Sequence, residues 1–324
     1  MRRAGWCLHH VVVILKRKMN ITELNSALAR EGITCTELAL ESFLQQERKK
    51  LCVSPEESIE GLETCLIITD SGEIARSFAE KQIGVVALLH RESEQEDFWG
   101  LAYAIDGLND IDVRYLDRVY RRLKGIPWDI LETKRCRLRE ITAADVPRIA
   151  ELYEYPSVKK YMEPLYTPLT REIAYTEDYI KHVYGYYEYG TWVIIEKSTG
   201  TIIGRAGLEN YADNQKDTGQ ESNQKKENPE NSLSEKAGQE CGEKQVELGY
   251  LIGDAYQRCG FAYEVCSAIL QYAKEQLGIP VVWTRIDREN KASIKLSEKL
   301  GFQGVKQTKD TNMLLLRYEM KEKI

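Results

Sequence analysis

Short apolar runs alternate with amphipathic helical patterns along most of this 324-residue chain, and that alternation limits it to an α/β fold. From Cys136 to Tyr318 the order is strand, helix, helix, three strands, helix, strand, helix and strand. This order predicts a mixed sheet with helices on its faces. Because the chain is also long enough to bury two cores, we expect a smaller α/β domain before the mixed sheet.

Residues 21–134 are expected to form the smaller α/β domain. Within it, the stretch TCLIITDSGEIARSFAEKQIGVVALL at residues 64–89 is typical of a strand, a helix and a second strand. Asp70 would then lie at the carboxyl end of a strand, where α/β sheets commonly place functional residues. The stretch weakly resembles the later part of a haloacid dehalogenase-like fold, in degenerate form, since no DxDxT nucleophile signature precedes it. We favour a helix-capping turn residue for Asp70, and a phosphatase acting through it is the alternative.

Two segments lack the pattern of a packed element. Residues 1–20 carry a short apolar run with two histidines, followed by KRKMN rather than a small-residue cleavage site. We interpret them as a flexible N-terminal extension. Residues 212–244 are almost free of apolar side chains, so they cannot bury enough surface to order themselves. We predict that they form a disordered insertion between two strands.

Charge and cysteine content narrow the partners and the compartment. The formal net charge of −6 disfavours nucleic acid and anionic membranes as partners and slightly favours cationic substrates such as amines. No apolar stretch of the sequence is long enough to span a membrane. The eight cysteines form no CxxC pair and no cluster with histidine, so we expect no metal site and a reducing, cytoplasmic location. The sequence predicts no particular oligomeric state.

The stretch YQRCGFAYEV, Tyr256–Val265, places a bare glycine where a strand runs into an amphipathic helix. No acidic residue precedes Glu264, although acidic side chains are favoured in the first turn of a helix. The free N–H groups at this helix end therefore predict an anion site. Gly260 allows a phosphate to approach the backbone closely, and Arg258 can add a charge-assisted hydrogen bond. A plain strand-to-helix turn is the alternative.

This loop resembles the acyl-CoA loop, Q/R-x-x-G-x-G/A, of the GNAT superfamily of N-acetyltransferases. The resemblance extends over Cys136–Tyr318, where VELGYLI is similar to the family's fourth strand and NKASIKLSEKLGF to its asparagine-led helix. It is closest to the branch that includes the ribosomal-protein N-terminal acetyltransferases. It implies that residues 135–324 form a GNAT domain that transfers acetyl from acetyl-CoA directly to a primary amine, without a metal. The acceptor would be a protein N-terminus or a small-molecule amine.

The resemblance also implies which residues bind acetyl-CoA. The pyrophosphate would sit on the loop, while the pantetheine arm would pair with the fourth strand and contact the family's asparagine. The cofactor-binding residues implied in this way are Tyr250, Leu251, Ile252, Gln257, Arg258, Cys259, Gly260, Phe261, Ala262 and Asn290.

Two residues are implied in catalysis. Glu247 matches a glutamate that many members use as a general base, and a solvent-facing strand residue is the alternative. Ser297 stands where many relatives have the tyrosine that protonates the departing thiolate, so the general acid is Ser297 or solvent. This departure keeps open a second function, a catalytically silent acyl-CoA-binding sensor. The aromatic run YIKHVYGYYEYG at residues 179–190 would line the acceptor site or simply pack as a helix.

Overall fold

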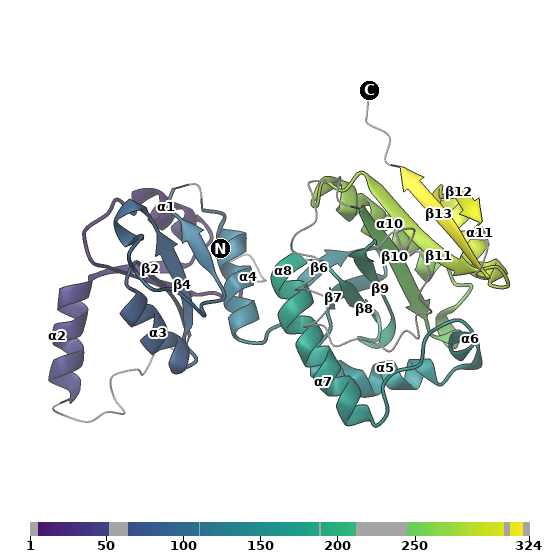
Figure 1. The fold of residues 1–324 in the computed structure, drawn as a ribbon, viewed down its shortest axis with the longest axis horizontal. Coiled ribbons are helices and arrows are strands. Elements are labelled where there is room, and N and C mark those ends of the chain that lie inside the picture. The colour runs from purple at the N-terminus through teal and green to yellow at the C-terminus, as the bar shows by residue number, and fades with distance from the viewer. Residues whose placement is uncertain are drawn as a thin grey trace, which may run out of the picture. The chain divides into compact units, whose positions relative to one another are not determined.

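The computed structural model describes residues 6–51, 64–109, 111–187, 189–211, 245–307 and 312–319. The chain divides into two compact units, Met1–Trp128 and Asp129–Ile324, and Figure 1 shows a sheet with its helices in each. The predicted insertion at residues 212–244 lies outside the described residues. None of the described helices is both long and apolar enough to cross a membrane.

The described part of the first unit is a five-stranded parallel sheet in the order β2-β1-β3-β4-β5, which is the order of flavodoxin-like doubly wound folds. One hydrophobic core lies under α1 and α4 and a second lies under α2 and α3, so both faces of the sheet are covered. The strands are β1 (His10–Leu15), β2 (Thr34–Ala39), β3 (Cys65–Thr69), β4 (Gly84–Leu89) and β5 (Ala104–Asp106). The helices are α1 (Thr22–Arg30), α2 (Leu40–Leu51), α3 (Gly72–Glu80) and α4 (Val113–Leu123).

The prediction of a flexible extension over residues 1–20 is wrong for residues 7–15, which the structure holds in place, and residues 1–5 lie outside the described residues. β1 lies between β2 and β3, and its residues 11–15 are buried. The N–H groups of Cys7 and Leu8 both donate to Oδ1 of Asp117 in α4, each at 2.8 Å, which anchors the chain ahead of the strand. A strand that is covered on both faces is a continuous apolar run without alternation. Such a run is hard to distinguish in sequence from a short secretory segment.

The second unit contains the predicted mixed sheet. Its described strands follow the order β12-β13-β11-β10-β9-β8-β7-β6, in which β10 and β11 are parallel and the other neighbouring pairs are antiparallel. The predicted fold class is confirmed. The strands are β6 (Asp129–Glu132), β7 (Cys136–Glu140), β8 (Thr191–Glu196), β9 (Ile202–Asn210), β10 (Gln245–Ile252), β11 (Val281–Asp287), β12 (Gln303–Gln307) and β13 (Met313–Glu319). The helices are α5 (Val146–Tyr153), α6 (Pro156–Lys159), α7 (Leu169–Tyr179), α8 (Gly185–Tyr187), α10 (Phe261–Glu275) and α11 (Lys291–Leu300).

The second unit begins at Asp129 rather than near Arg135, because β6 belongs to its sheet. The antiparallel register of β6 with β7 places Asp129 opposite Arg139 and Glu132 opposite Arg137. β6 is four residues long, which is too short for its alternation to be read from the sequence.

The strands β10 and β11 separate beyond their first residues. Parallel pairing joins residues 245–247 to residues 281–283, whereas β10 stays paired with β9 from Val246 to Ile252. From Leu248 onward, the edge of β10 that faces β11 therefore has no strand partner in the described part of the chain. Helix α10 packs on one face of this sheet and α5 on the other. The candidate site lies where the two strands separate.

Candidate active site

The predicted anion loop joins the end of β10 to α10. Gly260 at the N-cap has a φ of 84° and Arg258 has a φ of 59°, so both adopt the left-handed conformation. The N–H of Glu264 donates to the carbonyl of Gly260 at 3.1 Å, which begins the helical hydrogen bonds. The N–H groups of Phe261 and Ala262 precede that bond and lie at the positive end of the helix. An anion can bind there without displacing a side-chain cap, because Gly260 supplies none.

Arg135 binds the carboxylate of Glu264, so this acidic side chain does not occupy the free N–H groups at the start of α10. No sequence pattern singles out Arg135. Its main-chain N–H and its Nε donate to Oε1 and Oε2 of Glu264 at 2.8 and 2.7 Å. Its Nη1 donates to the carbonyl of Cys259 at 2.9 Å, and its guanidinium lies 4.1 Å from the ring centroid of Phe261. Burial alone would raise the pKa of Glu264, but hydrogen bonds from Thr133 and Arg135 hold it below its usual value. Arg135 thus engages the acidic side chain and braces the loop.

A cavity of about 590 Å³ opens beside this loop, between β10, α10 and α11. Cys259 is exposed and Phe261 is buried, and neither lines this cavity. The side chain of Gln257 also shapes the loop, because its Nε2 donates to the carbonyl of Ile252 at 3.0 Å. The remaining eight predicted cofactor residues all line the cavity: Tyr250, Leu251, Ile252, Gln257, Arg258, Gly260, Ala262 and Asn290.

The chemistry of this first cavity suits a long ligand that carries several phosphates. Arg258, Lys291 and Lys299 line it, and Glu289 is the described acidic residue among them. These cations complement the open helix end. On the other wall, the unpaired edge of β10 offers main-chain donors and acceptors to an extended chain of amides. Asn290 caps α11, where its Oδ1 accepts from the N–H of Ser293 at 3.1 Å.

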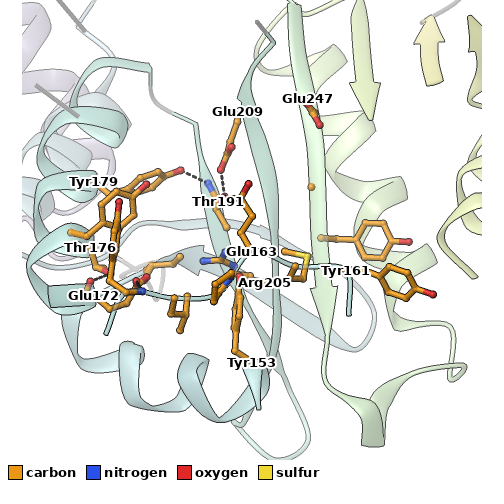
Figure 2. A pocket seen from close by; sticks show the side chains of 18 residues that line it. Tyr153, Tyr161, Glu163, Glu172, Thr176, Tyr179, Thr191, Arg205, Glu209 and Glu247 are labelled. Carbon is orange, nitrogen blue, oxygen red and sulfur yellow. Dashed lines mark hydrogen bonds between the residues drawn. The ribbon is translucent and has the colours of Figure 1, made fainter. Parts of the chain in front are cut away.

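A second cavity, of about 560 Å³, lies over β8, β9 and β10 of the same sheet. Figure 2 shows Glu209, Arg205 and Glu247 on the strands, facing Glu172, Thr176 and Tyr179 of α7. The N–H of Thr191 donates to the hydroxyl of Tyr179 at 2.8 Å. From the aromatic run at 179–190, Tyr179 lines this cavity, whereas Tyr184 and Tyr189 are buried in the core. Three residues line both cavities, so the two spaces adjoin there: Tyr161, Met162 and Tyr250.

Glu247 lines the second cavity and forms an ion pair. Its Oε2 lies 2.6 Å from Nη2 and 2.7 Å from Nε of Arg285 on β11. Its cross-strand partner on β9 is a second acidic residue, Glu209. Its neighbours Val246 and Leu248 lie on the opposite face of the strand and are buried in the core. Arg285 could not be assigned from sequence, because its contact depends on how far β10 and β11 stay paired.

The structure does not bring Ser297 into either cavity. Ser297 is 2% exposed and lies on the buried face of α11, where it lines neither cavity. Ser293, one turn earlier, lines the first cavity, and its Oγ accepts a hydrogen bond from the Tyr250 hydroxyl at 2.8 Å. Burial raises the pKa of Tyr250 above its usual value. Two of the described residues that line both cavities carry a hydroxyl, Tyr250 and Tyr161, and the hydroxyl of Tyr161 donates to the carbonyl of Glu289 at 3.3 Å.

The described part of the first unit does not assemble a comparable group around Asp70. Asp70 is 2% exposed, its Oδ1 accepts from the N–H of Lys16 at 2.9 Å, and its Oδ2 lies 3.3 Å from Nε2 of His90. The predicted helix-capping role is wrong, because the N–H of Gly72 at the start of α3 donates to Glu96, at 2.8 Å. Within the described ranges, no three His, Cys, Asp or Glu side chains are grouped as metal ligands. Asp70, which follows β3, therefore links the carboxyl ends of three strands through its contacts with Lys16 after β1 and His90 after β4.

Known proteins match the second unit. The uncharacterized N-acetyltransferase p20 of Bacillus licheniformis is 25% identical over 178 residues, which are 54% of this chain and 83% of that protein. The uncharacterized N-acetyltransferase YoaA of Bacillus subtilis strain 168 is 26% identical over 176 residues, or 54% of this chain and 82% of that protein. Among solved structures, an acetyltransferase from Agrobacterium tumefaciens strain C58 is similar with a TM-score of 0.42 and 20% identity, over 59% of this chain and 94% of that one.

The family model described as an acetyltransferase (GNAT) domain matches residues 135–303, which is more than half of the chain. The matched range contains the loop before α10, the separated strands and both cavities described above. Through this second unit, the chain belongs to the GNAT family of acetyltransferases.

Proposed function

We propose that this chain is an acetyl-CoA-dependent N-acetyltransferase that moves an acetyl group directly onto a primary amine, either a protein N-terminus or a small molecule. The observation that carries the proposal is that two cavities of different chemistry adjoin at Tyr250. A cofactor in the first cavity and an acceptor in the second would meet beside Tyr250 and Glu247. Such a meeting is what direct transfer between two bound molecules requires.

The residues present fit acetyl-CoA, which when bound supplies the acetyl group as a reactive thioester. The N–H groups at the start of α10, with Arg258, would hold the pyrophosphate. Lys291 and Lys299 would add positive charge for the remaining phosphate. The unpaired edge of β10 at residues 250–252 would pair with the amides of the pantetheine arm, and Asn290 would contact the same arm.

Glu247 is proposed as the general base. The acceptor nitrogen must lose a proton to attack the acetyl carbon, and a carboxylate can take that proton directly or through water. Arg285 orients the Glu247 carboxylate at 2.6 Å. A C–N bond then forms while the C–S bond breaks, the amine proton passes to Glu247, and the sulfur receives a different proton.

Tyr250, rather than Ser297, is proposed to provide the proton for the departing sulfur. Its side chain lines both cavities, and its hydroxyl donates a hydrogen bond to Ser293, which lines the first cavity. Because burial raises the pKa of Tyr250, its phenol keeps its proton at neutral pH and can donate it when negative charge develops nearby. Ser297 lines neither cavity.

The proposal is tested by thiol release from acetyl-CoA over a panel of amines and peptides, together with calorimetric binding of acetyl-CoA. We expect binding and turnover with at least one class of primary amine. Binding without turnover across the whole panel would favour the alternative, a silent acyl-CoA sensor. Failure to bind acetyl-CoA would overturn both.

A further inference from the structure

Acidic side chains outnumber basic ones in the second cavity, which we call the acceptor cavity. Among the described residues that line it, the charged side chains are those of Arg205, Glu163, Glu172, Glu209 and Glu247. Figure 2 shows Glu209 and Glu247 at one end of this space and Arg205 farther along it. A cavity lined by one sign of charge attracts ligands of the opposite sign.

The glutamates differ in how far their charge is already compensated. Glu247 is paired with Arg285 at 2.6 Å. Glu172 is 6% exposed and accepts a hydrogen bond from the N–H of Tyr166 at 2.8 Å. Glu209 accepts a hydrogen bond from the Thr191 hydroxyl at 3.0 Å and has no ion-pair partner in the part of the chain that the structure describes. Glu209 therefore faces the cavity without an ion pair among the described residues, and the charge of Arg285 acts on it only from a longer distance.

The register of β9 and β10 increases this imbalance. Glu209 and Glu247 are directly opposite each other in the antiparallel pair. Like charges at opposite positions of two strands repel and destabilise the pair. Arg285 forms an ion pair with Glu247 and acts on Glu209 only through its longer-range charge, so a cation bound beside Glu209 would relieve the remaining repulsion.

Tyrosine side chains form the wall of the cavity that faces Glu209. The ring centroids of Tyr166 and Tyr175 lie 5.2 Å apart, and those of Tyr175 and Tyr179 lie 6.4 Å apart. Burial, followed by the charge of Glu209, raises the pKa of Tyr175 to about 12, so this phenol stays neutral. Aromatic faces attract ammonium groups, and phenol oxygens accept hydrogen bonds from them.

Arg205 and Tyr153 support a competing interpretation, in which the acceptor carries a carboxylate. Tyr153 is 6% exposed, its hydroxyl has no hydrogen-bond partner among the described residues, and the guanidinium of Arg205 lies 5.0 Å from its ring centroid. The pKa of this phenol is raised, mainly by burial. Arg205 opposes the rise, and the carboxylates of Glu172, Glu209 and Glu163 add to it. A carboxylate placed there would meet three negative charges for one positive charge. The buried Tyr153 hydroxyl favours neither ion, because a phenol both donates and accepts hydrogen bonds.

We infer that the acceptor cavity takes an aliphatic amine with a second positive charge, a diamine or polyamine, and that Glu209 is the residue that recognises the second ammonium. This inference rests on the proposed function. One amino group would lie beside Glu247 for acetylation, and the other would bind between Glu209 and the tyrosine wall.

Three acceptors of equal chain length test the inference in the full chain: 1,4-diaminobutane, butylamine and 4-aminobutyrate. We expect kcat/KM for the diamine to exceed that for butylamine by about tenfold or more, as one charge-assisted contact provides. The acid should be the poorest acceptor. Added salt should narrow the gap, because it screens the charge of the cavity.

Glu209→Gln keeps the hydrogen bond from Thr191 but removes the charge. It should abolish the advantage of the diamine over butylamine, measured as the ratio of their kcat/KM values in the same variant, so that any effect common to both acceptors cancels. Glu196→Gln is the matched control, because Glu196 is also a strand glutamate that accepts from a threonine hydroxyl, that of Thr199 at 2.9 Å, and it lines neither cavity. Glu196→Gln should keep the preference for the diamine. Thermal unfolding of both variants shows whether they remain folded.

Calorimetry with the same three amines in the presence of CoA measures the order of their affinities independently of turnover. If no amine is acetylated but the diamine still binds best, the proposed function fails and the inference about the cavity stands. Equal binding of diamine and butylamine, or a preference that survives Glu209→Gln, would overturn the inference. Strongest binding of 4-aminobutyrate would also overturn it and would assign Arg205 and Tyr153 to a carboxylate.

Discussion

Glu247 lies between a cation and a like charge, since Arg285 pairs with it and Glu209 stands opposite it on β9. Glu247→Gln preserves size and hydrogen bonding but removes basicity. We expect kcat to fall about 10²-fold or more, with acetyl-CoA affinity unchanged because the anion loop is untouched. The loss should shrink at alkaline pH, where more of the amine is deprotonated in solution. Steady-state rates across neutral and alkaline pH check this, and normal turnover at neutral pH would assign the base to another group or to water.

Tyr250 and Ser297 can be separated by two conservative variants. Tyr250→Phe removes only the hydroxyl of a side chain that lines both cavities, so we expect kcat to fall about 10²-fold. Ser297→Ala removes a hydroxyl that is buried away from both cavities, so kcat should stay near that of the parent chain. Rapid-quench or steady-state rates with one acceptor measure both. A larger loss for Ser297→Ala than for Tyr250→Phe would restore Ser297 as the general acid.

The loop between β10 and α10 depends on its left-handed glycine, Gly260, whose φ is 84°. Gly260→Val would force a branched side chain into a strained backbone conformation at the anion site. We expect acetyl-CoA affinity to fall by about tenfold or more. Gly278, beyond the other end of α10, has a φ of 63° and open space around it, so Gly278→Val imposes similar strain away from the cavity. Calorimetry should show weaker binding for Gly260→Val only, and equal affinities would remove the loop from the cofactor site.

The turn that leads into α5 contains a buried ion pair. The two Nη atoms of Arg139 donate to Asp145, each at 2.7 Å, and the N–H of Thr142 donates to it at 2.8 Å. Burial alone would raise the pKa of Asp145, but hydrogen bonds from Arg139 and Thr142 hold it below its usual value. A carboxyl whose pKa falls on folding contributes stability above its unfolded pKa of about 3.9. That contribution is lost as the pH falls through the folded value.

Asp145→Asn should therefore lower the free energy of unfolding of the second unit at neutral pH by about 3 kcal/mol, because it leaves Arg139 without its buried partner. It should also make stability less sensitive to acid below the unfolded pKa. Glu151→Gln in α5 is the control, since Glu151 forms an exposed pair with Arg148 and such pairs contribute about 0.5 kcal/mol. Denaturant titrations at neutral and acidic pH measure these effects, and equal losses for the two variants would contradict the argument.

In the whole molecule, β6 places the start of the acetyltransferase unit at Asp129. We expect a fragment of residues 129–324 to fold alone and bind acetyl-CoA as the full chain does. A fragment of residues 135–324 should unfold at lower temperature, because the loss of β6 leaves β7 as an exposed edge strand. Thermal unfolding and calorimetry compare the fragments. Equal stability would show that β6 adds nothing to the sheet.

Sequence patterns predicted the fold class and the family of the second unit, and both are confirmed. They failed at β1, because a strand buried on both faces has no period to reveal it. They also misassigned Asp70, whose partners Lys16 and His90 come from neighbouring strands. The roles of Glu247 and of the loop residues stay predictions.

The sequence by itself determined the elements and turns whose signals are local: the strand VELGYLI, the glycine turn at Gly260 and the helix that follows it. These depend on neighbouring residues, so they can be read along the chain. Only the tertiary structure decided which side chains meet. Arg135 contacts Glu264 across 129 residues, Tyr250 contacts Ser293 across 43, and Arg285 contacts Glu247 across 38. Each contact depends on strand order, on register and on the point where β10 and β11 part, which are properties of the sheet and not of any segment within it.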